Sequence, residues 1–173
     1  VIPVYEGYAL KHSIGRSNVG GKDVDTVLQE CLRKQVGVRF TTSAEGDLVK
    51  KMKEEICYVR TPDLNTGGGG GNKDKNNNNN DSSSASSASE QMTYQLPDGQ
   101  TISLSSERHL PTEVLFNPSL IGSEEPNVAE TLVSSISKSD LDLRSTLYTQ
   151  IVLAGGTTLT PGFGNRLLHE VRK

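Results

Sequence analysis

The sequence predicts a mixed fold of helices and strands, and three stretches of the chain carry that prediction. A capping box at residues 42–45 precedes apolar residues at helical spacing, which is typical of an amphipathic helix. Residues 92–104 alternate apolar and polar side chains around a Pro-Asp-Gly turn, which is typical of a hairpin. Residues 150–171 contain a run predicted to be a buried strand, a glycine turn and a helical pattern. Together these stretches indicate a core built from both kinds of element.

The first forty residues are expected to form a strand, a turn and a helix. Residues 1–10 are rich in β-forming side chains, and residues 17–21 contain asparagine and paired glycines that tolerate a turn. Asp23 is expected to be the N-cap of the helix, and Gly37 is expected to end it. The apolar face of this helix would consist of Val24, Val27, Leu28, Cys31 and Leu32.

The second helix has the clearer pattern. Thr42 and Glu45 have the spacing of a capping box, in which each side chain binds the other residue's free amide. A single apolar stripe follows, made of Leu48, Val49, Met52, Ile56 and Val59. Several charged residues lie off that stripe and, on their own, are typical of a solvated helix face: Lys50, Lys51, Lys53, Glu54 and Glu55.

Residues 65–91 differ in composition from the rest of the chain. Their only apolar members are Ala85 and Ala88, so they bury too little apolar surface to offset the entropy of ordering. We therefore predict a disordered Gly/Asn/Ser-rich insert in a single, incomplete domain formed by residues 1–64 and 92–173. The run of glycines at 67–71 is not a P-loop, because no Gly-Lys-Ser/Thr follows it.

Residues 105–149 are expected to be mostly helical. Short helical pieces surround Glu107 and Glu113, and a loop rich in turn-forming residues spans 117–126. Longer helices are expected at about 127–137 and from a cap at Ser139 or Asp140. Their apolar faces would be formed by Val128, Leu132, Val133, Ile136, Leu143, Leu147 and Tyr148.

Charge and hydropathy exclude several classes of protein. The 18 basic and 21 acidic residues give a net charge of −3, and they are interspersed, which argues against a partner nucleic acid held by bulk positive charge. No apolar run approaches the ~18–20 residues that span a bilayer, so direct membrane insertion is not expected. Cys31 and Cys57 fit no metal or disulfide spacing and are predicted to be reduced core thiols.

The strongest local signal for binding is Gly155-Gly156-Thr157-Thr158, between the predicted strand and helix. Two glycines let the backbone approach a ligand, two hydroxyls add polar contacts, and a helix N-terminus favours an anion. A tight turn without a ligand explains the same residues about as well. No catalytic or metal site is predicted, since there is no G-x-S-x-G motif and the histidines are far apart in sequence at positions 12, 109 and 169.

Four blocks of the sequence resemble the second half of an actin-family protein. In chain order they are VIPVYEGYALKHSIGR, TTSAEGDLVKKMKEEICYV, YQLPDGQTISL and IVLAGGTTLTPGFGNRLL. The resemblance runs from residue 1 to 173 and is interrupted only by residues 65–91. Two further blocks look most like the actin-related protein of the dynactin minifilament, with conventional actin and other actin-related proteins as alternatives: SISKSDLDLRSTLYTQIVLAGGTTL and GFGNRLLHEVRK.

The resemblance implies an α/β fold of the actin, sugar-kinase and heat-shock ATPase type, in partial form, mostly the lobe of subdomains 3 and 4. In that fold ATP or ADP, with Mg²⁺, lies in a cleft between two lobes. Lys50 stands where actin usually has arginine, and Thr160 stands where an aromatic residue is usual, so two stacking surfaces for adenine are missing. The positions that match the family's nucleotide contacts are Gly21, Lys50, Lys53, Glu54, Gly155, Gly156, Thr157, Thr158, Leu159 and Thr160.

The resemblance also implies which parts of the site lie elsewhere. Both Asp-Gly phosphate loops, the phosphate-binding lysine, the water-positioning residues and the Mg²⁺ contacts correspond to sequence upstream of Val1. The segment that completes the fold corresponds to sequence beyond Lys173. No catalytic residue is therefore expected in these 173 residues, and this chain alone is not expected to hydrolyse ATP. A complete parent chain is compatible with a slow ATPase.

Three functions fit this resemblance. The first is a cytoplasmic cytoskeletal subunit that binds ATP, assembles with like subunits into a short filament and joins other dynactin subunits in dynein-driven transport. The alternatives are a conventional actin-type ATPase filament subunit and a divergent, non-polymerising actin-related protein that acts as a regulatory binding module. Leu120 and Ile121 match a region used against neighbouring subunits, although burial in the subunit's own core would explain them equally well.

Overall fold

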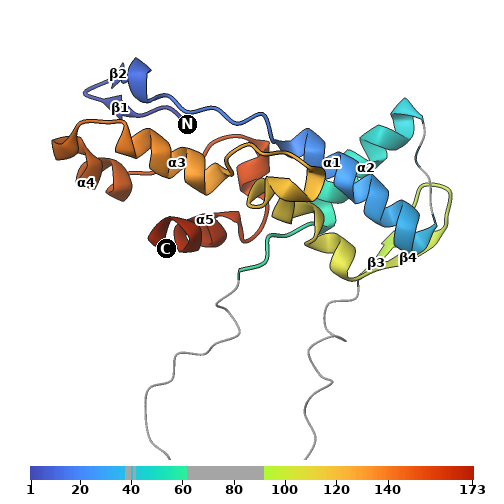
Figure 1. The fold of residues 1–173 in the computed structure, drawn as a ribbon. Coiled ribbons are helices and arrows are strands. Elements are labelled where there is room, and N and C mark those ends of the chain that lie inside the picture. Colours follow the sequence, from blue (N-terminus) through green and yellow to red (C-terminus); the bar gives the residue numbers. More distant parts are fainter. Residues whose placement is uncertain (38–39, 41, 62–91) are drawn as a thin grey trace, which may run out of the picture.

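The chain folds around two apolar clusters, and the helix at residues 21–31 contributes side chains to both. The computed structural model describes residues 1–37, 40, 42–61 and 92–173. In Figure 1 the helices at residues 21–31 and 43–56 lie at one end with the hairpin of residues 92–104, and the hairpin of residues 4–9 lies at the other end with the helices between residues 128 and 172. The predicted insert, residues 65–91, lies outside the described residues, so the division into 1–64 and 92–173 stays a prediction.

The first cluster is formed by α1 (Gly21–Cys31), α2 (Ser43–Ile56) and a hairpin. The hairpin pairs β3 (Met92–Gln95) with β4 (Thr101–Leu104) in antiparallel register, with Met92 opposite Leu104. Its turn contains Gly99 at a φ of +84°, so the hairpin agrees with the sequence prediction. The buried side chains of this cluster are Leu28, Leu32, Val49, Met52, Ile56, Cys57, Leu96, Ile102 and Leu104.

The start of α1 corrects the prediction that Asp23 is its N-cap. The N-cap is Gly20, and Asp23 lies three residues later, where its carboxylate accepts a hydrogen bond from the Gly20 amide at 2.8 Å. An acid in the first turn satisfies a free amide and complements the helix dipole as well as an acid at the cap would. Gly37, at a φ of +76°, ends the π-helical turn Leu32–Val36 that continues α1, as predicted.

The capping box of α2 is confirmed. The Thr42 hydroxyl accepts from the Glu45 amide at 3.3 Å, and the Glu45 carboxylate accepts from the Thr42 amide at 2.8 Å. Three members of the predicted stripe are buried within the helix, whereas Val59 follows the helix end and is buried in the second cluster. The local pattern therefore identified α2 correctly, but not its last turn.

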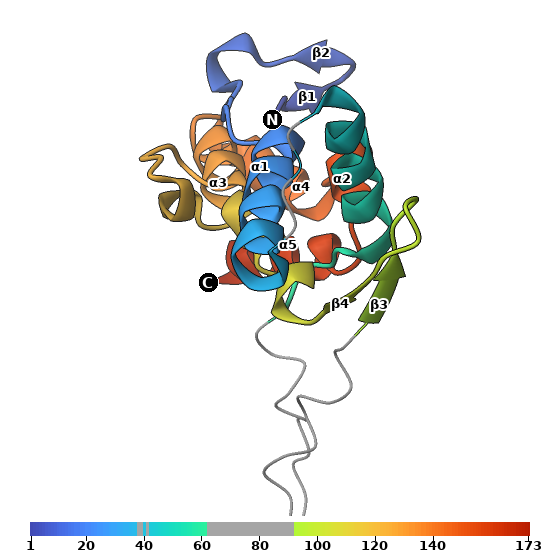
Figure 2. The ribbon, with the colours of Figure 1, turned by 90° about the vertical axis from the view of Figure 1, so that its right-hand side faces the viewer.

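The second cluster contains α3 (Val128–Ser137), α4 (Leu141–Thr149) and α5 (Phe163–Arg172), which lie close together in Figure 1 and Figure 2. Asn127 is the N-cap of α3, and its side-chain oxygen accepts a hydrogen bond from the Glu130 amide at 2.9 Å. The buried side chains of this cluster are Val24, Val59, Leu115, Phe116, Ala129, Leu132, Ile136, Phe163 and Leu167.

Residues 1–10 form a small hairpin and not the single strand that was predicted. The strands β1 (Val4–Tyr5) and β2 (Tyr8–Ala9) are antiparallel, and Glu6 and Gly7 connect them with φ angles of +50° and +83°. Two consecutive positive φ angles are the geometry of a tight hairpin turn, which reverses the chain after only two paired residues. The run of β-forming residues was recognised, but its reversal was not.

Residues 150–154 have no regular secondary structure and are not the buried strand that was predicted. Val152 is 88% exposed, and its neighbours Ile151 and Leu153 are exposed as well. A strand needs a neighbour to complete its hydrogen-bond ladder, and within the described part of the chain no segment pairs with these residues. The helix that follows begins at Phe163, slightly later than the predicted start near Pro161.

The segments that run between the two groups of helices are joined by Glu125. Its carboxylate accepts hydrogen bonds from the Asn18 backbone amide at 2.6 Å, from the Asn18 side-chain amide and, more weakly, from the Ser17 hydroxyl at 3.4 Å. The two bonds from Asn18 hold the pKa of Glu125 below its ordinary value. The segment that enters α1 is thereby tied to the one that enters α3.

The two cysteines are free thiols, as predicted, and they differ in burial. Cys57 is buried, and desolvation raises the pKa of its thiol to about 12. Cys31 is half-buried, and its pKa is raised mainly by burial and next by Glu107. Because the thiolate is the reactive form, both thiols are protected, Cys57 more strongly.

We expect Cys57 to resist modification by a disulfide reagent at pH 8 in the native protein, whereas Cys31 should react slowly. In denaturant both should react at the rate of a free thiol, and peptide mapping would assign each modification. Because folding raises the pKa of Cys57, the unfolded chain loses this proton at a lower pH than the folded chain does. The free energy of unfolding should therefore fall as the pH rises above about 9. Rapid native labelling of Cys57 would contradict this account.

Candidate functional site

A cleft of about 530 Å³ lies where α1, α2 and two 3-10 segments meet. The 3-10 segments are η5 (Pro111–Leu115) and η7 (Gly156–Leu159). The structure places most of the predicted site residues in the lining of this cleft: Gly21, Lys50, Lys53, Glu54, Gly156, Thr157, Leu159 and Thr160. Gly155 and Thr158 belong to the adjoining turn and are not part of the lining.

Gly21 lies at a crowded point of the cleft. A Cβ atom added to it would lie 3.0 Å from the Thr157 hydroxyl oxygen and 3.3 Å from the Lys53 ammonium nitrogen. The missing side chain therefore lets the start of α1 approach both α2 and the η7 turn. Such a close approach favours a residue without a side chain.

The two lysines of the cleft have different surroundings. Lys53 donates a hydrogen bond to the Gly21 carbonyl at 3.1 Å and forms an ion pair with the Asp25 carboxylate at 2.8 Å. Lys50 and Glu54 are exposed and bind no other residue in the described part of the chain. They lie four residues apart on α2 and therefore share one helix face, where a cation and a hydrogen-bond acceptor can meet the same ligand.

The glycine turn is held by its own hydrogen bonds. Gly155 has a φ of +101°, and its carbonyl accepts a hydrogen bond from the Thr158 hydroxyl at 2.7 Å. That hydroxyl is therefore used inside the turn, whereas Thr157 lines the cleft. Since α5 begins at Phe163, the amides nearest the turn belong to the short segment η7 and not to a long helix.

Four residues of the site were missed by sequence reasoning. Val24, Thr112 and Leu115 line the cleft, and Asp25 holds Lys53 from behind. Val24 and Leu115 look like ordinary core residues in the sequence, and Asp25 looks like a surface charge. The buried Thr112 hydroxyl donates to the carbonyls of Tyr58 and His109, both at 2.8 Å, which fixes η5 as one wall. No sequence signal distinguishes such residues from the rest of the core.

The described residues contain neither a cluster of metal ligands nor a membrane-spanning helix. No group of three His, Cys, Asp or Glu side chains in residues 1–37, 40, 42–61 and 92–173 could hold a metal ion. None of the helices that the structure describes is both long and apolar enough to span a bilayer.

The described part of the chain is thus a mixed domain of helices and two small hairpins, with a cleft lined mainly by α1, α2, η5 and η7. The family model described as Actin matches residues 1–173. The chain belongs to the actin family, and its fold is a part of the actin-like ATPase fold, as the sequence predicted.

Two curated relatives are similar over nearly the whole chain. An actin-like protein of Neurospora crassa is 41% identical over 172 residues, which are 99% of this chain and 42% of that protein. Centractin of Schizosaccharomyces pombe is 41% identical over 171 residues, which are 99% of this chain and 41% of that protein. The chain thus spans about two fifths of the length of these relatives. Because their identities are equal, the similarity shows an actin-related protein and does not single out one member.

Proposed function

We propose that this chain is part of an ATP-binding, actin-related filament subunit of the centractin kind. In this proposal the subunit works in the cytoplasmic cytoskeleton, assembles with like subunits and joins other dynactin subunits in dynein-driven transport. The observation that carries it is the cleft, which gathers residues from α1, α2 and η7 that lie far apart in the sequence. The similarity to a protein named centractin supports the finer assignment.

The residues of the cleft fit a nucleoside phosphate. The volume of about 530 Å³ lies within the range of small-molecule sites. The Glu54 carboxylate can accept hydrogen bonds from ribose hydroxyls, and the Lys50 ammonium group can donate to the nucleoside beside it. Val24, Leu115 and Leu159 supply apolar surface for a base. Mg²⁺, when bound with ATP or ADP, would neutralise phosphate charge, and we place its contacts outside these residues.

Exposed apolar side chains support assembly with like subunits. Leu120 is 56% exposed and Ile121 is 37% exposed, both within the 3-10 segment Pro118–Ile121. Their exposure argues against the alternative that they belong to the subunit's own core. Apolar side chains that a free subunit leaves in water are suited to burial against a neighbour.

We expect replacement of Gly21 by alanine to weaken ATP binding about tenfold in the natural full-length protein. The new Cβ would press on Thr157 and Lys53, so both would shift in the cleft. Displacement of a fluorescent ATP analogue would give the affinities. Gly46→Ala is the matched control, since nothing lies within 4 Å of its Cβ position on α2. No ATP binding by the wild type would refute the proposed function, and equal affinities would refute the role of Gly21.

One observation favours the alternative of a non-polymerising binding module. Lys50 and Thr160 line the cleft, and the resemblance assigns both to its adenine side, where neither offers a planar surface for stacking. Sedimentation and electron microscopy in ATP would separate the two functions. Filaments would support the subunit proposal, whereas weak ATP binding without filaments would support the module. The intact mass of the endogenous protein, with peptides mapped, should come first because it defines the chain to be assayed.

A further inference from the structure

Glu125 connects two segments of the chain that lie 107 positions apart in the sequence. One of its carboxylate oxygens accepts from the Asn18 backbone amide at 2.6 Å, and the other accepts from the Asn18 side-chain amide. Each partner segment is also closed by a local bond. The Ser17 hydroxyl accepts from the Val19 amide at 3.3 Å, and the Ser123 hydroxyl accepts from the Glu125 amide at 3.3 Å. The contact therefore joins two locally closed pieces of backbone.

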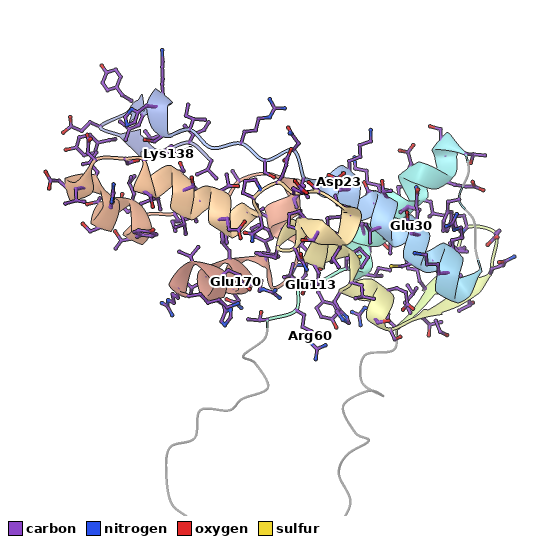
Figure 3. The ribbon with its side chains drawn as sticks, viewed as in Figure 1. Asp23, Glu30, Arg60, Glu113, Lys138 and Glu170 are labelled. Atoms are coloured by element: carbon purple, nitrogen blue, oxygen red, sulfur yellow. The ribbon has the colours of Figure 1, made fainter. Side chains whose placement is uncertain are left out.

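The first of these segments leads directly into the cleft. Only Val19 and Gly20 separate Asn18 from Gly21, which lines the cleft at the start of α1. The Gly20 amide is itself held by the Asp23 carboxylate at 2.8 Å, and Figure 3 labels Asp23 at this end of α1. Because the connection is so short, a shift of the Asn18 backbone changes how Gly21 approaches the rest of the cleft.

The second segment is the loop that contains the exposed 3-10 segment Pro118–Ile121. The Pro118 carbonyl accepts from the Ser123 amide at 3.2 Å, which closes the loop two residues before Glu125. The contact between Glu125 and Asn18 therefore holds the whole loop to the segment that enters the cleft.

The same contact contributes little to the core of the protein. Asn18 is exposed and Glu125 is half-buried, and neither belongs to one of the two apolar clusters. Hydrogen bonds at such an exposed position add little to the free energy of unfolding. Loss of the contact should therefore leave the fold in place and change the path by which the chain enters the cleft.

We propose that Glu125 is a positioning residue for the cleft. By holding the Asn18 backbone it fixes the approach of Gly21, and it links the occupancy of the cleft to the order of the loop at residues 118–125. This inference rests on the proposed nucleotide function. It predicts that breaking the contact weakens ATP binding, because the released segment must then be ordered when the ligand binds.

The test exchanges the donor and the acceptor of this contact in the full-length protein. Asn18→Asp places two carboxylates face to face, so ATP should bind about three- to tenfold more weakly, as measured by displacement of a fluorescent ATP analogue. Glu125→Ala should weaken binding to a similar extent. Combining Asn18→Asp with Glu125→Gln should restore the wild-type affinity, since the introduced amide can donate to the introduced carboxylate. Glu124→Ala is the matched control, at an exposed neighbouring acid without a hydrogen-bond or ionic partner in the described part of the chain.

Amide hydrogen exchange separates positioning from a change in stability. ATP should slow exchange at residues 118–125 in the wild type and in the double variant, but not in Asn18→Asp, while the denaturation midpoints of the three proteins stay close together. An unchanged affinity in Asn18→Asp, or a double variant that binds as weakly as Asn18→Asp, would overturn the inference. Glu125→Ala decides the question in the same way if Asn18→Asp does not fold. Failure of the wild type to bind ATP would refute the proposed nucleotide function, and this inference with it.

Discussion

Replacing Gly162 by alanine is expected to destabilise the protein by roughly 3 kcal/mol. Gly162 has a φ of +85°, which a residue with a side chain adopts only at a cost of about 1–2 kcal/mol. The added Cβ would also lie 2.3 Å from the Val59 carbonyl oxygen, which is backbone and cannot rotate away. The chain would have to separate there and strain the hydrogen bond from the Val59 amide to the Pro161 carbonyl, now 2.8 Å long.

Chemical denaturation of the full-length protein would measure this loss as a lower midpoint. Gly164→Ala is the matched control two residues later in α5. Its Cβ would meet only the Leu153 side chain at 3.7 Å, so alanine should leave the stability unchanged or raise it by up to about 1 kcal/mol through helix propensity. A loss below about 1 kcal/mol for Gly162→Ala would show that the chain relaxes around the new atom.

Replacing Arg166 by methionine is expected to cost about 2 kcal/mol, because one guanidinium group joins α5 to the wall of the cleft. Its Nη1 donates to the Arg60 carbonyl at 2.6 Å and to the Glu113 carboxylate at 3.0 Å, and its Nε donates to Glu170 at 2.8 Å. The side chain is 14% exposed, and its guanidinium carbon lies 5.2 Å from the centre of the Phe116 ring. Figure 3 shows Arg60, Glu113 and Glu170 on their three segments.

The pH dependence of this loss tests its electrostatic origin. Hydrogen bonds from Lys173 and, to a smaller extent, Arg166 hold the pKa of Glu170 below 4.5. A lowered carboxyl pKa contributes stability above the unfolded-state pKa, and that stability is lost as the pH falls through the folded-state pKa. The difference between wild type and Arg166→Met should therefore shrink in acid. Arg172→Met, on an exposed turn of α5, should change the denaturation midpoint little at any pH. An equal loss of stability in both variants would exclude the contacts of Arg166 with Arg60, Glu113 and Glu170 as the cause.

The sequence predicted those elements that depend on interactions between residues only a few positions apart in the chain. The capping box of α2 depends on two side chains three positions apart, and the hairpin around Gly99 depends on a short turn and local alternation. The actin-type fold was also predicted, because long blocks of sequence resemble that family and the family model matches the whole chain. The resemblance also predicted the site residues, and the structure brings most of them to the lining of one cleft.

Only the tertiary structure decided features that depend on distant partners. Residues 150–154 have a strand's composition, yet no described segment pairs with them, and strand formation requires such a neighbour. Asp25 looks like a surface charge until α2 places Lys53 against it, and Lys53 meets Gly21 across 32 positions of sequence. By itself, therefore, the sequence determined the local elements and the family. Packing decided which charges are compensated in the cleft, because burial and pairing depend on residues that local patterns do not relate.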